Sequence, residues 1–247
     1  MDKLYDTHFH LDLQESRDEI LDEIERNKIY TIAVTNLPPL YEKLKKEINS
    51  KYIKIVLGLH PELICQYSKY IPDMWRLLPD AKYIGEVGID LKTQNESKKL
   101  QIVFFEELIE RCGKLGKKIL SIHSRMAASN VISIIGEDFN GKVILHWYSG
   151  SEKVLMQAIN SGYYFSVNYS MLCSTSGRKV IMNIPDDKVL IETDSPFTFM
   201  NKKIFRPIQI PMIIEGIAKI KNKNTEQVKN DLWNNFVNLI SNKQGHY

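Results

Sequence analysis

The side chains most capable of chemistry in this sequence are histidines and carboxylates that stand where apolar segments end. Five of the six histidines hold such positions, and only His246 lies in the tail. His8 and His10 are two residues apart on an expected strand, so both imidazoles point to the same side. Glu86 interrupts an apolar segment, where a carboxylate is costly unless it is paired or binds a cation. The predicted metal ligands are His8, His10, Glu86, His123, His146 and Asp194.

Each of these residues also has an ordinary structural explanation when it is considered alone. A histidine that ends an apolar run is often a hydrogen-bonded core residue, and Glu86 could form a buried salt bridge. Asp194 stands before Ser195 and Pro196, where an aspartate commonly caps a turn. Six such coincidences at the ends of successive apolar segments are less credible than one shared cation site.

The ligand types indicate a catalytic rather than a structural metal site. Four imidazoles with two carboxylates exceed the four ligands of a closed structural zinc, which is usually rich in cysteine. They suit two divalent cations that share one carboxylate, and Glu86 is the predicted shared ligand. The other ligands divide into His8, His10 and Asp194 for one cation, and His123 and His146 for the second.

Hydrolysis is the chemistry that such a site performs. Divalent cations lower the pKa of bound water, and Asp194 could accept the proton that this water releases. Asp194 and Glu86 are therefore the predicted catalytic residues. Imidazole ligands favour zinc, whereas phosphodiester chemistry often uses magnesium or manganese, so Mg²⁺, Mn²⁺ and Zn²⁺ all remain open.

Apolar β-type segments alternate with amphipathic ones along the whole chain, which predicts parallel βαβ units. Eight such strands predict an α/β fold of the closed (β/α)₈ TIM-barrel type, whose active site lies at the carboxyl ends of the strands. A doubly wound sheet is the alternative, but no GxGxxG motif follows the first strand. The expected strands are Leu4–His8, Tyr30–Asn36, Ile53–Leu59, Tyr83–Val87, Ile119–His123, Val143–His146, Tyr163–Val167 and Val189–Glu192.

Helical periodicity is found in six of the intervening segments. Ser16 and Glu19 have the spacing of a capping box, and another helix is expected to begin at Ser151 and stop before Gly162. The expected helices are 16–28, 97–115, 151–161, a short one at 179–184, and two closing helices at 209–221 and 225–241.

The composition is that of one globular domain, expected over residues 1–247. The net charge of +3 permits a polyanionic partner without indicating one. The first residues lack a secretory signal pattern, and no apolar run is long enough to cross a membrane. Cys65, Cys112 and Cys173 form no CxxC pair, so we interpret them as reduced thiols of a cytoplasmic protein.

The motifs occur in an order that resembles the TatD family of metal-dependent deoxyribonucleases. The resemblance spans nearly the whole chain, which makes it specific. Its segments are Asp6-Thr-His-Phe-His-Leu-Asp12, Gly58-Leu-His-Pro61, Ile84-Gly-Glu-Val-Gly-Ile-Asp90, Ile122-His-Ser-Arg125, Leu145-His-Trp-Tyr-Ser-Gly150, Tyr164-Phe-Ser-Val167, Glu192-Thr-Asp-Ser-Pro196 and Asn235-Phe236.

The resemblance implies a barrel fold, one to three divalent ions, and hydrolysis of DNA phosphodiesters, often from a 3′ end. It implies the same six metal ligands, and it assigns His60 and Arg125 to the substrate phosphate. An arginine fork suits phosphate oxygens, although a salt bridge at a helix start explains Arg125 equally well.

Residues 197–207 depart from the family pattern, which continues with a proline-rich stretch containing Arg-Gly-Lys. Arg206 is a candidate replacement for the family arginine as a phosphate ligand, but the glycine is absent. This departure puts the substrate in doubt and leaves the metal ligands intact. Other details resemble the QatD group, the TatD-like components of Qat anti-phage defence cassettes, which implies other Qat proteins as partners.

Two other functions fit parts of the sequence. A small-molecule amidohydrolase or phosphoesterase shares the HxH motif, but many such enzymes bridge their metals with a modified lysine where Glu86 stands here. A scaffold or sensor subunit with vestigial catalysis is suggested if the apolar residues Phe197, Phe199, Met200 and Phe205 are exposed, as we expect for a partner site. The alternative is that they form a loop packed over the barrel mouth. The aromatic residues that could stack on bases of a single strand, or simply line the barrel end, are Trp147, Tyr148, Tyr164 and Tyr169.

Overall fold

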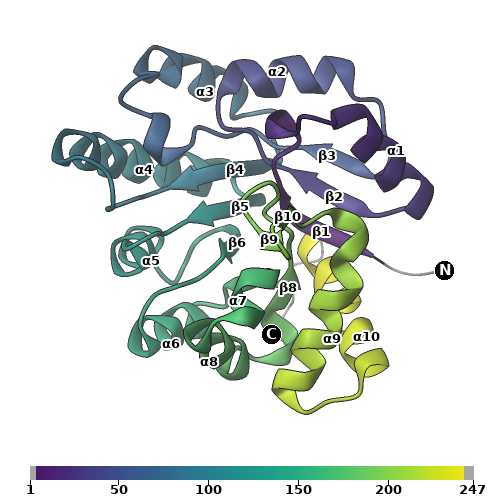
Figure 1. Ribbon diagram of the computed structural model, residues 1–247. Helices are drawn as coiled ribbons and strands as arrows, with labels where there is room; N and C mark the ends of the chain where they lie inside the picture. Colours follow the sequence, from purple (N-terminus) through teal and green to yellow (C-terminus); the bar gives the residue numbers. More distant parts are fainter. Residues whose placement is uncertain (1–3, 242–247) are drawn as a thin grey trace.

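The computed structural model describes residues 4–241, and its main feature is a set of parallel strands in chain order (Figure 1). The strands are short apolar segments covered by helices, which lets both of their faces be buried. His246 and the ends of the predicted domain 1–247 lie outside the described residues. The strands are β1 (Tyr5–Phe9), β2 (Tyr30–Ala33), β3 (Ile53–Ile55), β4 (Tyr83–Gly88), β5 (Lys118–His123), β6 (Gly141–His146), β7 (Tyr164–Val167) and β8 (Val189–Ile191).

Two strand groups are joined into a closed barrel. β1 to β3 form one parallel sheet and β4 to β8 form another. A bridge between Leu57 and Ile84 connects the two groups on one side. On the other side the segment after β8 meets β1, where the amide of Asp194 donates to the carbonyl of His8 at 2.9 Å. The predicted (β/α)₈ barrel is confirmed, and the doubly wound sheet is wrong.

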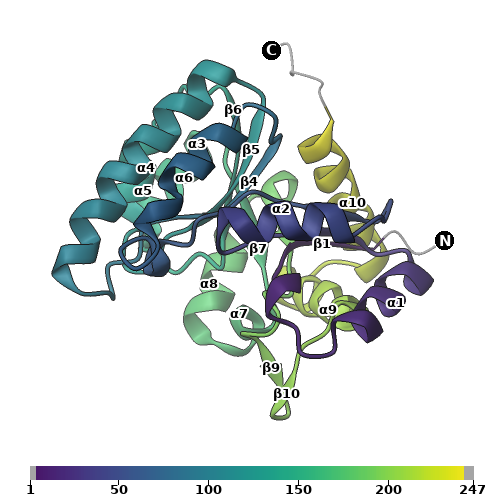
Figure 2. The ribbon, with the colours of Figure 1, turned by 90° about the horizontal axis from the view of Figure 1, so that it is seen from above.

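Helices surround the strands, as Figures 1 and 2 show. The α-helices are α1 (Arg17–Asn27), α2 (Pro38–Glu47), α3 (Ile71–Leu77), α4 (Asn95–Leu115), α5 (Ala128–Ile135), α6 (Glu152–Asn160), α7 (Tyr169–Cys173), α8 (Thr175–Asn183), α9 (Ile210–Lys221) and α10 (Thr225–Ile240). Short 3₁₀ turns occur at Leu11–Leu13, Pro61–Leu63, Ser68–Tyr70, Asp186–Lys188 and Pro207–Gln209.

The two predicted helix starts have different outcomes. The Ser151 hydroxyl caps α6 by accepting the amide of Val154 at 3.4 Å, as expected. The capping box of Ser16 and Glu19 is wrong, because the Ser16 side chain makes no capping hydrogen bond. The backbone at Ser16 is not extended (φ −99°, ψ 51°), and the Glu19 carboxylate pairs with Arg206 instead.

A buried lysine closes the end of the barrel opposite the histidines. Lys118 begins β5 and is only 5% exposed. Its ammonium donates to the carbonyls of Leu78, Pro79 and Ala81 at 2.8, 2.9 and 2.8 Å. Burial lowers the pKa of Lys118, and the three carbonyls compensate for its lost hydration. This side chain therefore ties the segment after α3 to the barrel wall.

A two-stranded hairpin, β9 (Phe199–Met200) and β10 (Lys203–Ile204), follows β8 and projects from the barrel (Figure 2). Asn201 and Lys202 form its turn with φ values of 51° and 64°. These are the left-handed values of a tight two-residue hairpin turn. The segment that departs from the family pattern is therefore an ordered hairpin beside the barrel mouth.

The apolar residues of this segment do not all lie at the surface. Phe197 and Phe199 are 52% and 54% exposed, in agreement with the expectation. Phe205 is fully buried and stacks on Tyr169, with 4.9 Å between the ring centroids, so its predicted exposure is wrong. Phe205 follows β10 rather than lying in it, and its amide donates to the carbonyl of the buried Thr198 at 2.9 Å, which holds it against the barrel instead of at the surface.

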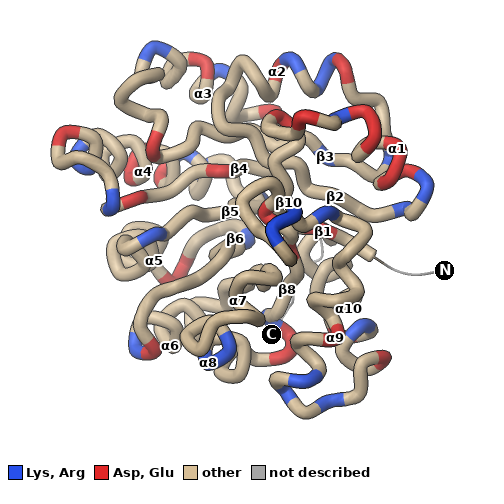
Figure 3. The backbone as a smooth tube through the Cα atoms, viewed as in Figure 1, with Lys and Arg blue, Asp and Glu red and all other residues tan. Residues whose placement is uncertain are grey.

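Charged residues of both signs are distributed over the outer helices (Figure 3). Lysines gather at the hairpin around β10, close to the barrel mouth in the same view. Among the described residues, no helix combines the length and apolar character that a membrane span requires.

Candidate metal centre

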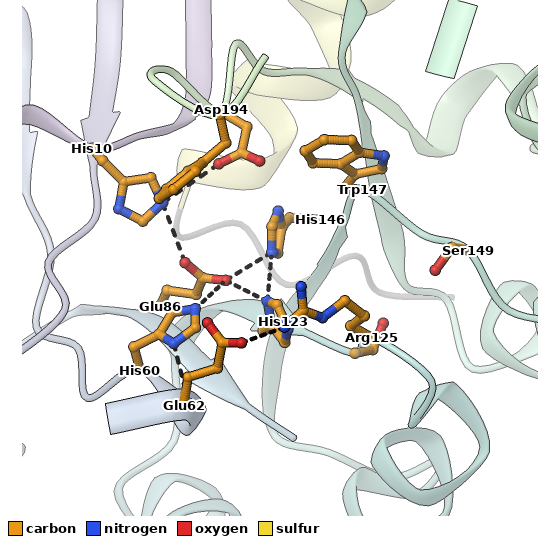
Figure 4. A pocket seen from close by; sticks show the side chains of 12 residues that line it. His10, His60, Glu62, Glu86, His123, Arg125, His146, Trp147, Ser149 and Asp194 are labelled. Carbon is orange, nitrogen blue, oxygen red and sulfur yellow. Dashed lines mark hydrogen bonds and ion pairs between the residues drawn. The ribbon is translucent and has the colours of Figure 1, made fainter. Parts of the chain in front are cut away.

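The predicted ligands lie together in a cavity of about 390 Å³ at the carboxyl ends of the barrel strands (Figure 4). His8 is fully buried and contacts residues of this cavity through its imidazole. The lining residues are His10, His60, Glu62, Glu86, His123, Ser124, Arg125, His146, Trp147, Ser149, Asp194 and Phe197.

The first group of possible ligands joins the first and last strands of the barrel. His8 and His10 come from the end of β1, and Asp194 follows β8. The Asp194 Oδ1 atom lies 3.9 Å from His8 Nε2 and 3.4 Å from His10 Nε2. All three side chains are almost completely buried. The three ligand atoms lie within 4.8 Å of one another, a separation that one cation can span.

Glu86 lies between this group and the remaining histidines. Its Oε2 atom lies 3.4 Å from His8 Nε2 and 3.3 Å from His10 Nε2. Its Oε1 atom accepts hydrogen bonds from His123 Nδ1 at 2.6 Å and His146 Nε2 at 2.9 Å. The two oxygens of one carboxylate therefore face two different pairs of imidazoles. That is the arrangement a shared ligand requires.

His60 is closer to the ligands than the family resemblance implies. Its Nε2 atom lies 3.3 Å from Glu86 Oε1, and it forms a third possible ligand group with Glu86 and His123. His60 is thus placed where it can contact either a cation or a phosphate bound to one.

The buried polar atoms of the centre fit divalent cations. His8 Nε2, His10 Nε2 and Asp194 Oδ1 have no hydrogen-bond partner. Such unpaired buried atoms are rare and cost about 1–3 kcal/mol each. All three face the same space, so one cation would satisfy them together. Imidazole and carboxylate are ligands that zinc accepts readily and that manganese tolerates.

Hydrogen bonds behind the first group orient its imidazoles. His8 Nδ1 lies 2.7 Å from the Ser121 hydroxyl, which leaves its Nε2 directed at Glu86. His10 Nδ1 lies 3.5 Å from the Asn36 amide. Partners of this kind fix the ring orientation and tautomer of metal-binding histidines. Sequence analysis did not find Ser121 or Asn36, because neither stands in a metal-binding pattern.

Asp90 holds His123, a predicted ligand of the second cation, and the sequence patterns did not predict it as a functional residue. It is fully buried, and its Oδ2 atom accepts hydrogen bonds from His123 Nε2 at 2.8 Å and Arg125 Nε at 2.7 Å. Gly88 lets the end of β4 lie close to the end of β5, because a Cβ atom at residue 88 would lie 2.1 Å from the His123 carbonyl. Asp90 ends the Ile84–Asp90 motif, which was the available signal.

Glu192 is a buried acidic support for the sixth strand. Its Oε1 atom accepts the amide of Trp147 at 3.1 Å and the Asn168 side chain at 3.0 Å, and its Oε2 atom accepts the Ser166 hydroxyl. Oε1 also lies 3.8 Å from His146 Nδ1. A carboxylate behind a metal-binding histidine increases its basicity. Glu192 therefore belongs to the centre, although it cannot reach the cavity.

Burial and neighbouring charges shift the pKa values of Glu86 and His10 in opposite directions. Burial alone raises the pKa of Glu86, but the imidazoles around it, with His60 and His146 foremost, hold that pKa well below its usual range. Burial lowers the pKa of His10, but the carboxylates of Asp194 and Glu86, 3.4 and 3.3 Å from its Nε2 atom, outweigh burial and raise the value to about 10. Cation binding at His10 must therefore displace a proton from its imidazole.

Two residues of the cavity have left-handed backbones. Trp147 has φ 40° and Asp194 has φ 48°, values that cost a side-chain-bearing residue of order 1–3 kcal/mol. Hydrogen bonds hold both residues, from the Trp147 amide to Glu192 and from the Asp194 amide to the His8 carbonyl. Strain of this kind is typical of residues positioned for function.

The two predicted arginines lie in different places. Arg125 lines the cavity, is 42% exposed, and is held by Asp90 and Glu62. Arg206 does not line the cavity and instead pairs with Glu19 and Glu23 of α1. Its role as a phosphate ligand stays a prediction. Only Arg125 of the two stands beside the candidate ligands.

Comparison with known proteins gives the family. Residues 5–241 match the model of the TatD related DNase family. The chain belongs to the TatD family. It is 28% identical over 247 residues to the deoxyribonuclease TATDN3 of Homo sapiens, covering 91% of this chain and 90% of the human protein. It is 27% identical over 243 residues to the uncharacterized metal-dependent hydrolase MJ1582 of Methanocaldococcus jannaschii, covering 94% and 95%.

Solved TatD structures share the fold. The crystal structure of YjjV, a TatD homolog from Escherichia coli K12, superposes with a TM-score of 0.84 at 19% identity and covers 96% of this chain and 98% of that one. The chain is therefore a metal-dependent hydrolase of the TatD family with its candidate ligands at the barrel mouth.

Proposed function

We propose that this protein is a deoxyribonuclease that cleaves single-stranded DNA from the 3′ end. The observation that supports it best is the position of Glu86, whose two oxygens face separate imidazole groups beside an arginine. Two-cation sites with a shared carboxylate are typical of enzymes that cleave phosphodiesters. The name of the human relative as a deoxyribonuclease agrees with this substrate class.

His8, His10 and Asp194 would hold one cation, and His123 and His146 would hold the second, with Glu86 shared between the two. Bound divalent cations supply Lewis acidity to the phosphodiester and ready ionisation to water. The candidate cations are Mg²⁺, Mn²⁺ and Zn²⁺.

The remaining residues position the substrate and move the proton. Arg125 binds a non-bridging phosphate oxygen, because Asp90 anchors its Nε and orients the guanidinium toward the cavity. His60, whose Nε2 atom lies 3.3 Å from Glu86 Oε1, contacts the same phosphate. Asp194 holds the proton released by water at its carboxylate, which is buried at the cavity wall.

The biological setting is proposed from sequence alone. Segments such as Ser121–Ala127 and His146–Gly150 resemble the QatD group, so we place the enzyme in anti-phage defence in the cytoplasm, with other Qat proteins as partners. Deletion of the gene from such a cassette should abolish protection against phage. Substitution of Glu86 should have the same effect as deletion if defence requires hydrolysis.

A nuclease assay on chelator-treated protein tests the activity. Single-stranded DNA labelled at its 5′ end should give a ladder that shortens from the 3′ end when Mg²⁺, Mn²⁺ or Zn²⁺ is restored. Glu86→Gln should reduce the rate by about a hundredfold to a thousandfold, because it removes the central charge of the site. Glu110→Gln, at an exposed helical ion pair, is the matched control and should have no effect.

The alternatives give different results in the same assay. Hydrolysis of small esters or lactams without any loss of DNA would indicate an amidohydrolase. Defence that survives Glu86→Gln while hydrolysis is lost would indicate a scaffold subunit. Absence of cleavage of single-stranded DNA with every cation would refute the proposed function.

A further inference from the structure

A second cavity adjoins the metal centre and has no part in the chemistry described above. It has a volume of about 330 Å³ and lies between the β6–α6 loop and the α7–α8 pair. Trp147 and Ser149 line both cavities, so the two spaces meet at these residues. A substrate chain bound at the metal centre therefore has to pass only these two residues to reach the second cavity.

The second cavity has an apolar floor and a polar rim. Tyr148, Leu155 and Met171 line it and are each about 1% exposed. Ser176 and Lys179 of α8 line its outer side and are exposed. Flat, weakly polar surfaces with a few polar groups at the edge suit a heteroaromatic ring, and a lysine at the rim suits a neighbouring phosphate.

Trp147 is oriented at the boundary between the cavities. Figure 4 shows its indole at the edge of the metal centre, near His146 and Asp194. Its left-handed backbone and the hydrogen bond from its amide to Glu192 fix the loop that carries the ring. The side chain is partly exposed rather than buried in the core. Tyr148 cannot act in this way, because it is buried and its hydroxyl donates to the Ser151 carbonyl.

We propose that Trp147 is a stacking platform and that the second cavity binds the nucleoside next to the scissile phosphate. This inference rests on the proposed nuclease function and adds a specificity-determining residue to it. Stacking is tolerant of sequence because every base has an aromatic face, so the subsite selects single-stranded nucleic acid over small phosphodiesters. A paired base cannot enter, because its faces are covered by its neighbours in the duplex.

Oligonucleotides that lack one base give the decisive test. Trp147→Ala should raise the KM for single-stranded oligothymidylate by about tenfold to a hundredfold, the range of one base–aromatic stack, with little change in kcat. Trp147→Phe should restore most of this loss. Two abasic substrates identify the base that stacks: one lacks the base of the terminal nucleotide, and the other lacks the base of the penultimate nucleotide. With wild type, one of them should show a higher KM than the intact oligonucleotide. Trp147→Ala should not raise that KM further.

A second variant tests the cavity independently of the indole. Ser176→Trp should fill the space and raise the KM for oligothymidylate, whereas the abasic oligonucleotide that shows the raised KM with wild type should show no further increase. Thr175→Trp is the matched control, because Thr175 is exposed on the same helix and does not line this cavity. The metal content of each variant is measured to verify that the centre is intact.

The results separate failure of the subsite from failure of the proposed function. If Trp147→Ala leaves the KM unchanged, or raises it equally for intact and both abasic oligonucleotides, the stacking role is refuted. Equal effects of Ser176→Trp and Thr175→Trp would refute the cavity as the binding site. If wild type hydrolyses neither oligothymidylate nor bis(p-nitrophenyl) phosphate with any cation, the nuclease function itself fails.

Discussion

Replacement of Glu192 by glutamine isolates the charge behind the metal centre. The buried carboxylate accepts hydrogen bonds from Trp147, Asn168 and Ser166 and lies 3.8 Å from His146 Nδ1. Glutamine has the same shape, and its carbonyl oxygen can accept from Trp147 and Asn168. Its NH₂ group can donate to the Ser166 hydroxyl, which can rotate to accept. Glu192→Gln should therefore fold normally while losing one negative charge.

The size of the effect follows from the distance. Unit charges at 3.8 Å attract by about 4 kcal/mol at an effective dielectric constant of about 20. A neutral imidazole that binds a cation feels only part of this attraction. Loss of a carboxylate behind such a ligand typically weakens metal binding by about tenfold to a hundredfold. We expect Glu192→Gln to reduce the affinity for the cation proposed at His123 and His146 by that factor.

Glu192→Ala provides the contrast. It leaves three buried donors without an acceptor, at about 1–3 kcal/mol each, or about 3–9 kcal/mol in total. That loss is comparable with the whole stability of a typical protein, so most of the alanine variant should be unfolded or unstable. Calorimetric titration of Zn²⁺ or Mn²⁺ into chelator-treated protein, together with thermal unfolding, measures both effects.

The reasoning would be refuted by either of two results. Glu192→Gln with wild-type affinity for both cations would show that the charge does not act on His146. Glu192→Gln as unstable as Glu192→Ala would show that the amide does not preserve the three hydrogen bonds, which contradicts the expectation that this variant changes the charge alone.

Three further predictions concern stability. Lys118→Met removes the donor shared by three carbonyls and should lower the free energy of unfolding by about 2–4 kcal/mol in urea, with the activity of the folded fraction unchanged. Saturating divalent cation should raise the Tm of chelator-treated protein by about 5–10 °C, since a hundredfold excess over Kd contributes about 2.7 kcal/mol. An unchanged Tm would contradict the interpretation that the unpaired buried atoms of His8, His10 and Asp194 bind a cation. Burial, opposed by hydrogen bonds from Thr193 and His8, raises the pKa of Asp6 to about 7. The unfolded chain releases this proton near pH 4, so stability should fall by about 4 kcal/mol as the pH rises from about 4 to about 7. Asp6→Asn in urea titrations should lack that part of the decline.

The fold and the ligand positions were predictable because both depend on short local patterns. A histidine that ends a buried strand must emerge at the strand's carboxyl end, so alternation of strands and helices sufficed to gather His10, His123 and His146. Helices were less predictable. α5 reads Ala-Ser-Asn-Val-Ile-Ser-Ile-Ile, a short and β-branched segment that resembles a strand. β3 ends at Ile55 rather than Leu59, although Leu57 still bridges to β4.

The residues behind the ligands could not be predicted from pattern. Ser121, Asp90 and Glu192 act through partners brought close only by the closed barrel, such as His8, which is 113 positions from Ser121. Arg206 illustrates the converse case. Its position in the divergent segment suggested phosphate, but two acidic side chains of α1 lie nearer to it. Local sequence carries no information about which of two distant partners an arginine meets.

The contact between β1 and the segment after β8, which closes the barrel, has a consequence for the order of folding. His8 and His10 are synthesised near the start of the chain, and Asp194 follows roughly ten to forty seconds later at ordinary rates of translation. Contacts of such high sequence separation form late, because a long loop must close first. Glu86, His60 and His123 come from the part of the chain around β3 to β5, whereas the candidate group of His8, His10 and Asp194 joins the first and last strands and forms only when the barrel closes. Cation binding by His8, His10 and Asp194 would therefore indicate that the barrel has closed.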